Sequence, residues 1–270
     1  MKKIMTIGLV AALASSGALA DEGVVMVDQS SAGAASTTEV SVDAALVSAY
    51  VWRGQVYNND VVVQSQVTVA HQGFSLNIWG NFDLGENNTG TEKSFSEIDF
   101  SLAYSLPVNM NQVAIDVGLI NYNFPNNGDA EPESDTTELF VKATFLSWAD
   151  QFIPSITGFG DVGGADGTYF LFDVAVPFEV SDYLAVEAGA SAGWGNTSYN
   201  DKYWAKGKDE GWNDYNVYAT ASYELLENVT LAANLTYTWL DGRVRSHAED
   251  ADKYEASRKF WYGVSVAYDF

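Results

Sequence analysis

The sequence predicts an all-β fold: a transmembrane antiparallel up-and-down β-barrel of about 12 strands. In the stretch Arg258–Phe270, every second residue from Phe260 onward is large and apolar, and the residues between them are mostly small or polar. A period of two indicates a strand with one apolar face. Similar alternation recurs along the chain, and the connections alternate between short and long. Loops sorted in this way are typical of membrane barrels, and a soluble sandwich has no reason to show them.

The first 20 residues are predicted to be a cleaved signal peptide. Lys2 and Lys3 precede the apolar run Ile4–Ala14, and Ala18-Leu19-Ala20 forms a small-residue cleavage site. We interpret residues 21–39 as a flexible lead-in rich in Ser, Ala and Gly, and residues 40–270 as the barrel. No other stretch approaches the roughly 18 consecutive apolar residues of a helical span, so a membrane form of the chain requires strands.

Charge and cysteine content narrow the classes of function. Without Lys2 and Lys3 the 13 basic residues fall to 11 against 36 acidic residues, which gives a formal charge of −25. This acidity argues against nucleic acid as a partner and suits a surface that meets cations. Because cysteine is absent, the chain has no disulfide framework and no thiolate metal site.

Twelve stretches are predicted as strands. In the first, Val40–Arg53, we place Leu46, Tyr50 and Trp52 in one outward apolar phase. The seventh, Phe152–Phe159, has the weakest signal because Pro154 removes a ladder donor. The other ten are Val61–His71, Phe74–Asp83, Phe95–Leu106, Val113–Asn123, Thr136–Ser147, Thr168–Phe178, Tyr183–Trp194, Trp212–Tyr223, Val229–Leu240 and Arg258–Phe270.

The connections predict the orientation of the barrel in the cell outer membrane. Short turns are expected in the periplasm together with both termini, and long loops outside. The long connections center on Asn58, Asn88, Gly128, Gly164, Tyr203 and Glu249, and the short ones on Gln72, Asn109, Trp148, Ser181 and Leu226.

The last strand resembles the assembly signal of bacterial outer-membrane barrels. Aromatic residues stand at both ends of its apolar face, and the chain stops on an aromatic residue. The expected partners are therefore the barrel assembly machinery, outer-membrane lipid and lipopolysaccharide. The residues assigned to the signal are Phe260, Tyr262, Tyr268 and Phe270.

Two segments resemble the opening of the TorF-type porin family of Gram-negative bacteria. They are Ala44–Gly54, which ends in Tyr-Val-Trp-Arg-Gly, and Gly73–Asp83. Ala49 departs from the family, which usually has an acid or Asn there, and the stretch after Gly54 also differs. The resemblance covers about the first third of the barrel plus the last strand. It implies an outer-membrane pore and brings no substrate or catalytic residues.

Charged residues in the phase opposite the apolar one are expected to face the lumen, since Arg or Lys facing mid-membrane lipid costs about 2–4 kcal/mol. One hypothesis is a constriction with an acidic excess that passes small hydrophilic solutes and favours cations or neutral ones. The alternative is that Arg53 and Lys142 only brace the wall by pairing with acids, Asp83, Glu97 and Asp99 being the expected partners of Arg53. The candidates are Arg53, Asp83, Glu97, Asp99, Asp116, Glu138, Lys142, Asp173 and Glu187.

Two other classes stay open: a structural or adhesion barrel with a blocked lumen, and an outer-membrane enzyme. Catalysis is not expected, because His71 and His247 are the only histidines and are predicted at opposite ends of the barrel. No cofactor or metal is expected either. Asp161–Gly167 as a Ca²⁺ loop and His247 beside its neighbouring acids as a metal site are weaker alternatives.

Overall fold

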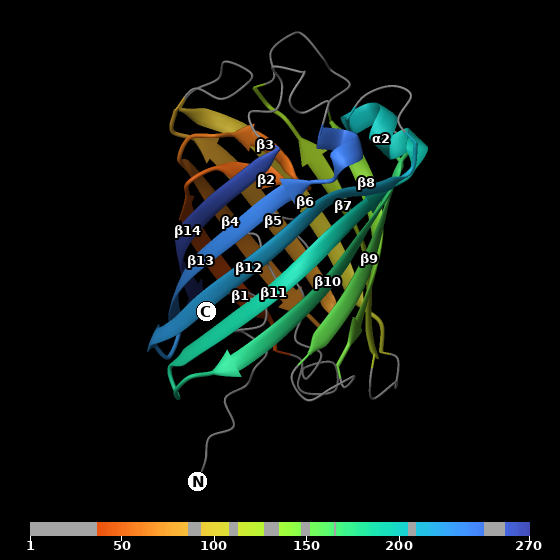
Figure 1. The fold of residues 1–270 in the computed structure, drawn as a ribbon. Helices are drawn as coiled ribbons and strands as arrows, with labels where there is room; N and C mark the ends of the chain where they lie inside the picture. The colour runs from red at the N-terminus through yellow and green to blue at the C-terminus, as the bar shows by residue number, and fades with distance from the viewer. Residues whose placement is uncertain are drawn as a thin grey trace.

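The computed structural model confirms the predicted fold class. In the described part of the chain, twelve strands close into an antiparallel barrel in the order β1-β14-β13-β12-β11-β10-β9-β8-β7-β6-β5-β4 (Figure 1). The barrel strands are β1 (Glu39–Val47), β4 (Val62–His71), β5 (Phe74–Asp83), β6 (Ser94–Ser105), β7 (Val113–Asn123), β8 (Thr136–Phe145), β9 (Ile153–Asp161), β10 (Thr168–Glu179), β11 (Leu184–Gly195), β12 (Gly211–Leu226), β13 (Val229–Leu240) and β14 (Arg258–Asp269).

Not all of the chain is described. The predicted signal peptide, most of the lead-in and His247 lie outside the described residues, as does much of several loops. No helix in the described part is long and apolar enough to cross a membrane. The described residues are 37–85, 93–107, 113–126, 135–146, 152–164, 166–204, 209–245 and 257–270.

The first strand closes the barrel from both sides. β1 pairs with β14 through Val42 and Tyr268, and with β4 up to the pair Val47 and Val62. Each barrel strand therefore has two neighbours, and no open edge is left. β14 ends at the end of the barrel where β1 begins, which we call the terminal end; the opposite end, which carries the helix α2 (Thr197–Tyr203), is the loop end (Figure 1).

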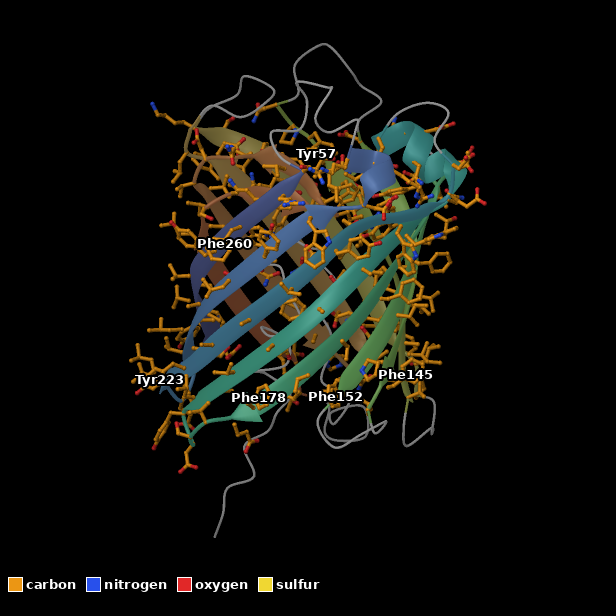
Figure 2. All side chains as sticks on the ribbon, in the orientation of Figure 1. Tyr57, Phe145, Phe152, Phe178, Tyr223 and Phe260 are labelled. Atoms are coloured by element: carbon orange, nitrogen blue, oxygen red, sulfur yellow. The ribbon has the colours of Figure 1, made fainter. Side chains whose placement is uncertain are left out.

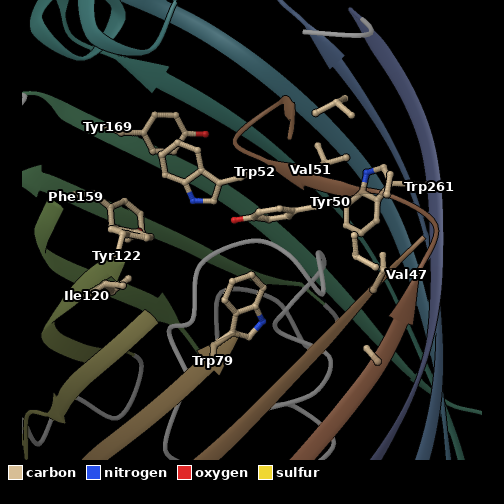
Figure 3. Packing of buried hydrophobic residues seen from close by; sticks show 14 of the residues in the cluster. Val47, Tyr50, Val51, Trp52, Trp79, Ile120, Tyr122, Phe159, Tyr169 and Trp261 are labelled. Carbon is tan, nitrogen blue, oxygen red and sulfur yellow. The ribbon is translucent and has the colours of Figure 1, made fainter. Parts of the chain in front are cut away.

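The prediction that the first strand continues to Arg53 is wrong. β1 ends at Val47, and the chain then forms a separate two-stranded hairpin of β2 (Tyr50–Trp52) and β3 (Gln55–Asn58). The two residues between Trp52 and Gln55 turn the chain with positive φ angles, and Gly tolerates such angles without strain. As a result Tyr50 and Trp52 are buried inside the barrel instead of facing outward (Figure 3).

The weak seventh strand is present as β9 and reaches Asp161. Its pairing with β8 starts at Ser155, so on that side no ladder bond is required of Pro154. On the other side Pro154 stands opposite Val174 of β10. Because Pro154 owes no ladder bond to β8, a proline at this position near the start of β9 is compatible with a barrel strand.

The outer surface is apolar along the strands and aromatic toward the ends. Leu76, Ile78 and Val264 are exposed on the outer face. Figure 2 shows side chains projecting outward near the terminal end and, from β14, nearer the loop end. An apolar band between aromatic girdles is typical of a barrel that spans a membrane. Among the residues labelled there, those on this outer face are Phe145, Phe152, Phe178 and Tyr223 at the terminal end and Phe260 toward the loop end.

The main hydrophobic core lies inside the barrel at the loop end. The hairpin supplies Tyr50, Val51, Trp52 and Val56 to it, and the barrel strands, the helix α2 and the β1–β2 connection supply the rest (Figure 3). Both faces of the hairpin are thus covered. The buried wall residues around it include Val47, Val62, Trp79, Ile120, Tyr122, Phe140, Phe159, Tyr169 and Trp261.

Candidate functional site

The candidate site is the contact between the β2–β3 hairpin and the inner wall of the barrel. At its tip, Arg53 has φ +45° and Gly54 has φ +81°. A Cβ added to Gly54 would lie 2.6 Å from Cβ of Asp214 and 2.7 Å from Cδ2 of Leu240. Glycine is therefore required twice over, for the backbone angle and for the close approach of the tip to β12 and β13.

Arg53 binds Glu138 of β8 through a forked ion pair. Its Nη1 donates to Oε1 at 3.0 Å and its Nη2 donates to Oε2 at 2.6 Å. The Tyr122 hydroxyl donates to the same carboxylate at 3.1 Å. Arg53 is 2% exposed and Glu138 is 1% exposed. Loss of either partner would leave a buried charge without compensation, which costs about 3–5 kcal/mol.

Four aromatic rings surround the Arg53 guanidinium. The distances from its Cζ to the ring centroids are 4.5 Å for Trp52, 4.4 Å for Phe159, 4.4 Å for Tyr169 and 5.7 Å for Tyr199. Such contacts are favourable by about 2 kcal/mol when desolvated. Since Phe159 and Tyr169 belong to the wall and Tyr199 to α2, the tip is held from several sides.

Tyr50 forms a second attachment. Its hydroxyl donates to Oε2 of Glu97 at 2.6 Å, and its ring packs against Trp79 with centroids 5.7 Å apart. Burial, together with the Glu97 and Asp99 carboxylates, raises the pKa of Tyr50 well above its ordinary value. The hydroxyl therefore keeps its proton and remains a donor.

Asn58, at the end of β3, forms a third attachment. Its side-chain amide donates to Oδ1 of Asp83 at 2.7 Å, and its amide oxygen accepts from the Asp60 backbone at 2.8 Å. Asn81 also donates to Asp83, at 3.0 Å. At the rim, the Lys259 ammonium contacts the side-chain oxygen of Asn59.

The helix α2 covers the hairpin from the loop end. The Asn196 side chain caps it by accepting from the Tyr199 backbone at 2.9 Å, and also accepts from the Thr168 backbone at 3.0 Å. These bonds fix Tyr199 beside Tyr169, with centroids 5.0 Å apart. Tyr203 of the same helix lies against Trp52 at 5.3 Å. The long connection centred on Tyr203 thus places aromatic side chains against the hairpin.

The predicted lumen residues fall into two groups. Arg53, Asp83, Glu97, Asp99 and Glu138 are buried at the loop end, although Arg53 reaches the lumen from the hairpin and not from a barrel strand. The partners expected for Arg53 were Asp83, Glu97 and Asp99. The ion pair in the structure is instead with Glu138, and Asp83 and Glu97 accept hydrogen bonds from other hairpin residues.

The second group lies nearer the terminal end. Asp116 and Lys142 stand opposite each other on β7 and β8, and Lys142 interacts electrostatically with Asp173 and Glu187. The Tyr218 hydroxyl donates to Asp173 at 2.9 Å. This section of the wall is polar and suited to water. Other buried polar residues along it are Thr68, Asn77, Ser101, Thr220, Asn234 and Ser265.

Of the alternative catalytic and metal sites, the one at His247 lies outside the described residues, and the structure places only His71 and the loop that follows Asp161. Nδ1 of His71 lies 3.1 Å from the Thr38 hydroxyl at the terminal end. Oδ1 of Asp161 accepts from the backbones of Gly163 and Gly164, at 2.8 and 2.9 Å, and so closes its own loop. Within the ranges that the structure describes, no three acidic or histidine side chains are grouped to hold a metal ion.

Sequence reasoning missed the inward aromatic residues. Tyr122, Phe140, Phe159 and Tyr169 stand in the lumen phase, where the sequence analysis considered only charged residues. A signal was present: β8 carries Leu139-Phe140-Val141, which is apolar in both phases near its loop end. A strand that is apolar on both faces needs a covered inner face as well as an outer one.

Comparison with known proteins supports the fold and gives a family. The KdgM porin structure superposes with a TM-score of 0.51 at 12% identity, covering 85% of this chain and 99% of that one. The NanC porin superposes with a TM-score of 0.52 at 12% identity, covering 85% and 98%. At such low identity the likeness concerns the fold alone. No curated protein sequence matches significantly.

A match between this sequence and a family model identifies the family. Residues 31–256 match the family model described as "Bacterial protein of unknown function (Gcw_chp)". The match spans most of the barrel, including the hairpin and the helix α2. The chain is therefore a member of the Gcw_chp family of bacterial proteins, built on the barrel fold that the KdgM and NanC porins also have.

Proposed function

We propose that the protein is a porin-like channel of the outer membrane for small hydrophilic solutes, and that the β2–β3 hairpin controls passage at its external mouth. The observation that carries the proposal is a hairpin inserted at one end of a barrel whose inner wall carries many polar side chains. The hairpin is anchored through the side chains of Glu138, Glu97 and Asp83 on the wall, and its own strands form a separate sheet.

The orientation follows from the loops. The loop end, with α2 and the hairpin, faces outside, and the terminal end faces the periplasm, as in other outer-membrane barrels. Lipid and lipopolysaccharide then contact the apolar outer face, and the barrel assembly machinery inserts the chain. Protease added to intact cells is expected to cut within 124–135, 195–211 or 241–257. Recovery of the protein as a soluble periplasmic species would contradict this location.

We also propose that the channel prefers cations or neutral solutes to anions. The second group of lumen residues contains Asp116, Asp173 and Glu187 against Lys142, while the charge of Arg53 is matched by Glu138. Fixed acids in a confined lumen concentrate cations and repel anions. Added salt screens this effect over about 10 Å at 0.1 M.

A second candidate is a structural or adhesion barrel whose lumen stays blocked. It is favoured by the packing at the loop end, where Tyr50, Trp52 and Tyr199 are each almost completely buried. Liposome swelling separates the two functions. Refolded protein in liposomes is expected to admit small neutral and cationic solutes faster than protein-free liposomes do. Impermeability of these liposomes to every small solute would favour the blocked barrel.

A further inference from the structure

The Arg53 side chain occupies a site built almost entirely by other parts of the chain. The carboxylate comes from Glu138 of β8, and three of the four rings come from Phe159, Tyr169 and Tyr199. Among the groups named, only Trp52 belongs to the hairpin that carries Arg53. The site and its occupant are therefore separable, because the hairpin is not part of the barrel wall.

The chemistry of the site selects a planar cation. Two carboxylate oxygens each accept one N–H bond, at 3.0 and 2.6 Å, which matches the fork of a guanidinium. The ring centroids lie 4.4 Å from Cζ for Phe159 and Tyr169, at a distance where π faces attract a weakly hydrated cation. An ammonium is a compact, strongly hydrated charge without the fork, so it fits this site less well.

The barrel can close without the hairpin. The chain leaves β1 at Val47 and enters β4 at Val62, and these two residues are paired neighbours in the wall. The Glu138 carboxylate also accepts from Tyr122 of β7, a contact that is independent of the hairpin. The wall side of the site is thus positioned by strands that pair with one another along their length.

We propose that Glu138, Phe159, Tyr169 and Tyr199 form a binding site for guanidinium-type organic cations, and that Arg53 fills it as a tethered ligand. A soluble guanidinium compound competes with Arg53 for the site and releases the hairpin tip. Binding itself is independent of channel activity. Only the consequence, that such compounds favour the open lumen, rests on the proposed function.

The test uses Arg53→Ala with methylguanidinium as the probe and methylammonium as the comparison of equal charge. Isothermal titration calorimetry on the refolded protein is expected to show saturable binding of methylguanidinium, about tenfold or more tighter than methylammonium. The double variant Arg53→Ala/Glu138→Gln is expected to lose that selectivity. Wild type is expected to bind more weakly than Arg53→Ala, because its own arginine competes.

Three results would overturn the proposal: no saturable binding, equal binding of the two cations, or binding unchanged by Glu138→Gln. If Arg53→Ala does not give the heat-modifiable migration of a folded barrel, a variant with residues 48–61 replaced by Asn-Gly presents the same wall without the arginine. Failure of both variants to fold would contradict a site that exists without Arg53. Liposome permeability is measured separately, so failure of the channel function leaves the binding result standing.

Discussion

Arg53 and Glu138 are 85 positions apart in the chain and join the tip of the hairpin to β8 through two hydrogen bonds inside the barrel. In the order of strands, β8 lies far around the barrel from β1, which leads into the hairpin. The hairpin therefore reaches across the lumen to form this ion pair. The Glu138 carboxylate holds the tip of the hairpin, while Glu97 and Asp83 hold Tyr50 and Asn58.

Replacing Glu138 with Gln is expected to release the hairpin while the barrel stays closed. The variant leaves the buried Arg53 charge without its counter-ion, at a cost of about 3–5 kcal/mol. Hydrogen exchange measured by mass spectrometry should then be faster for the backbone amides of residues 50–58 than in wild type. Glu179→Gln, at an exposed position at the end of β10, is the matched control. Unchanged protection of the hairpin would show that the ion pair does not hold it.

Gly54→Ala is expected to displace the hairpin tip by sterics, without a change of charge. An added Cβ meets Asp214 and Leu240 at 2.6 and 2.7 Å, on a backbone with φ +81°. A non-glycine residue in such a conformation costs about 1–3 kcal/mol before the contacts are counted. Faster hydrogen exchange in the hairpin is the readout. Gly164→Ala, where an added Cβ meets nothing within 4 Å, is the control and should behave like wild type. Equal hydrogen exchange in the two variants would argue against close packing of the hairpin tip against β12 and β13.

The barrel was predictable from the sequence because its signal is local and repeated. Apolar residues alternate with small or polar ones along Arg258–Asp269 because one face of the strand meets lipid and the other meets water. Short and long connections alternate because they lie on opposite sides of the membrane. The hairpin was missed because Tyr50 and Trp52 continue the phase of β1, so alternation alone could not end that strand at Val47. The turn at Arg53-Gly54 between two short apolar runs was the available signal for it.

The charged lumen residues could be predicted because a charge facing lipid is costly, but this argument says nothing about which residues they contact. Energetics excludes Glu138 and Lys142 from a lipid-facing surface, whichever residues they contact. The pairing of Arg53 with Glu138 depends on a hairpin that crosses the lumen, and no spacing in the sequence encodes that distance. The cage of Phe159, Tyr169 and Tyr199 likewise arises only when three separate elements meet.

Neutralising Asp173 and Glu187 together, as Asn and Gln, is expected to weaken cation preference. Both side chains face the lumen away from the hairpin and interact with Lys142. They therefore set the net charge of that section of the lumen. Reversal potentials in a KCl gradient should favour potassium in wild type, most clearly at low salt. Lys142→Met should shift the preference further toward potassium. Anion selectivity of the wild type would contradict the proposed role of these acids.

Deleting Tyr268–Phe270 is expected to reduce the yield of folded barrel sharply. Tyr268 pairs with both Val42 and Val229, and the Phe270 backbone donates to the Val40 carbonyl at 2.9 Å. Backbone groups left unpaired in lipid cost several kcal/mol each. Heat-modifiable migration of outer-membrane fractions measures the yield. Tyr223→Ala, which removes an exposed aromatic side chain of β12 at the terminal end, is the control and should assemble normally.

The central claim is that the β2–β3 hairpin closes a polar lumen. Single-channel conductance in planar bilayers tests it when wild type is compared with the variant whose residues 48–61 are replaced by Asn-Gly, a turn short enough to join the paired Val47 and Val62. A closing hairpin predicts small or rare openings for wild type and a larger, steady conductance for the variant. Equal conductance of the two proteins, or no conductance from either, would contradict the claim.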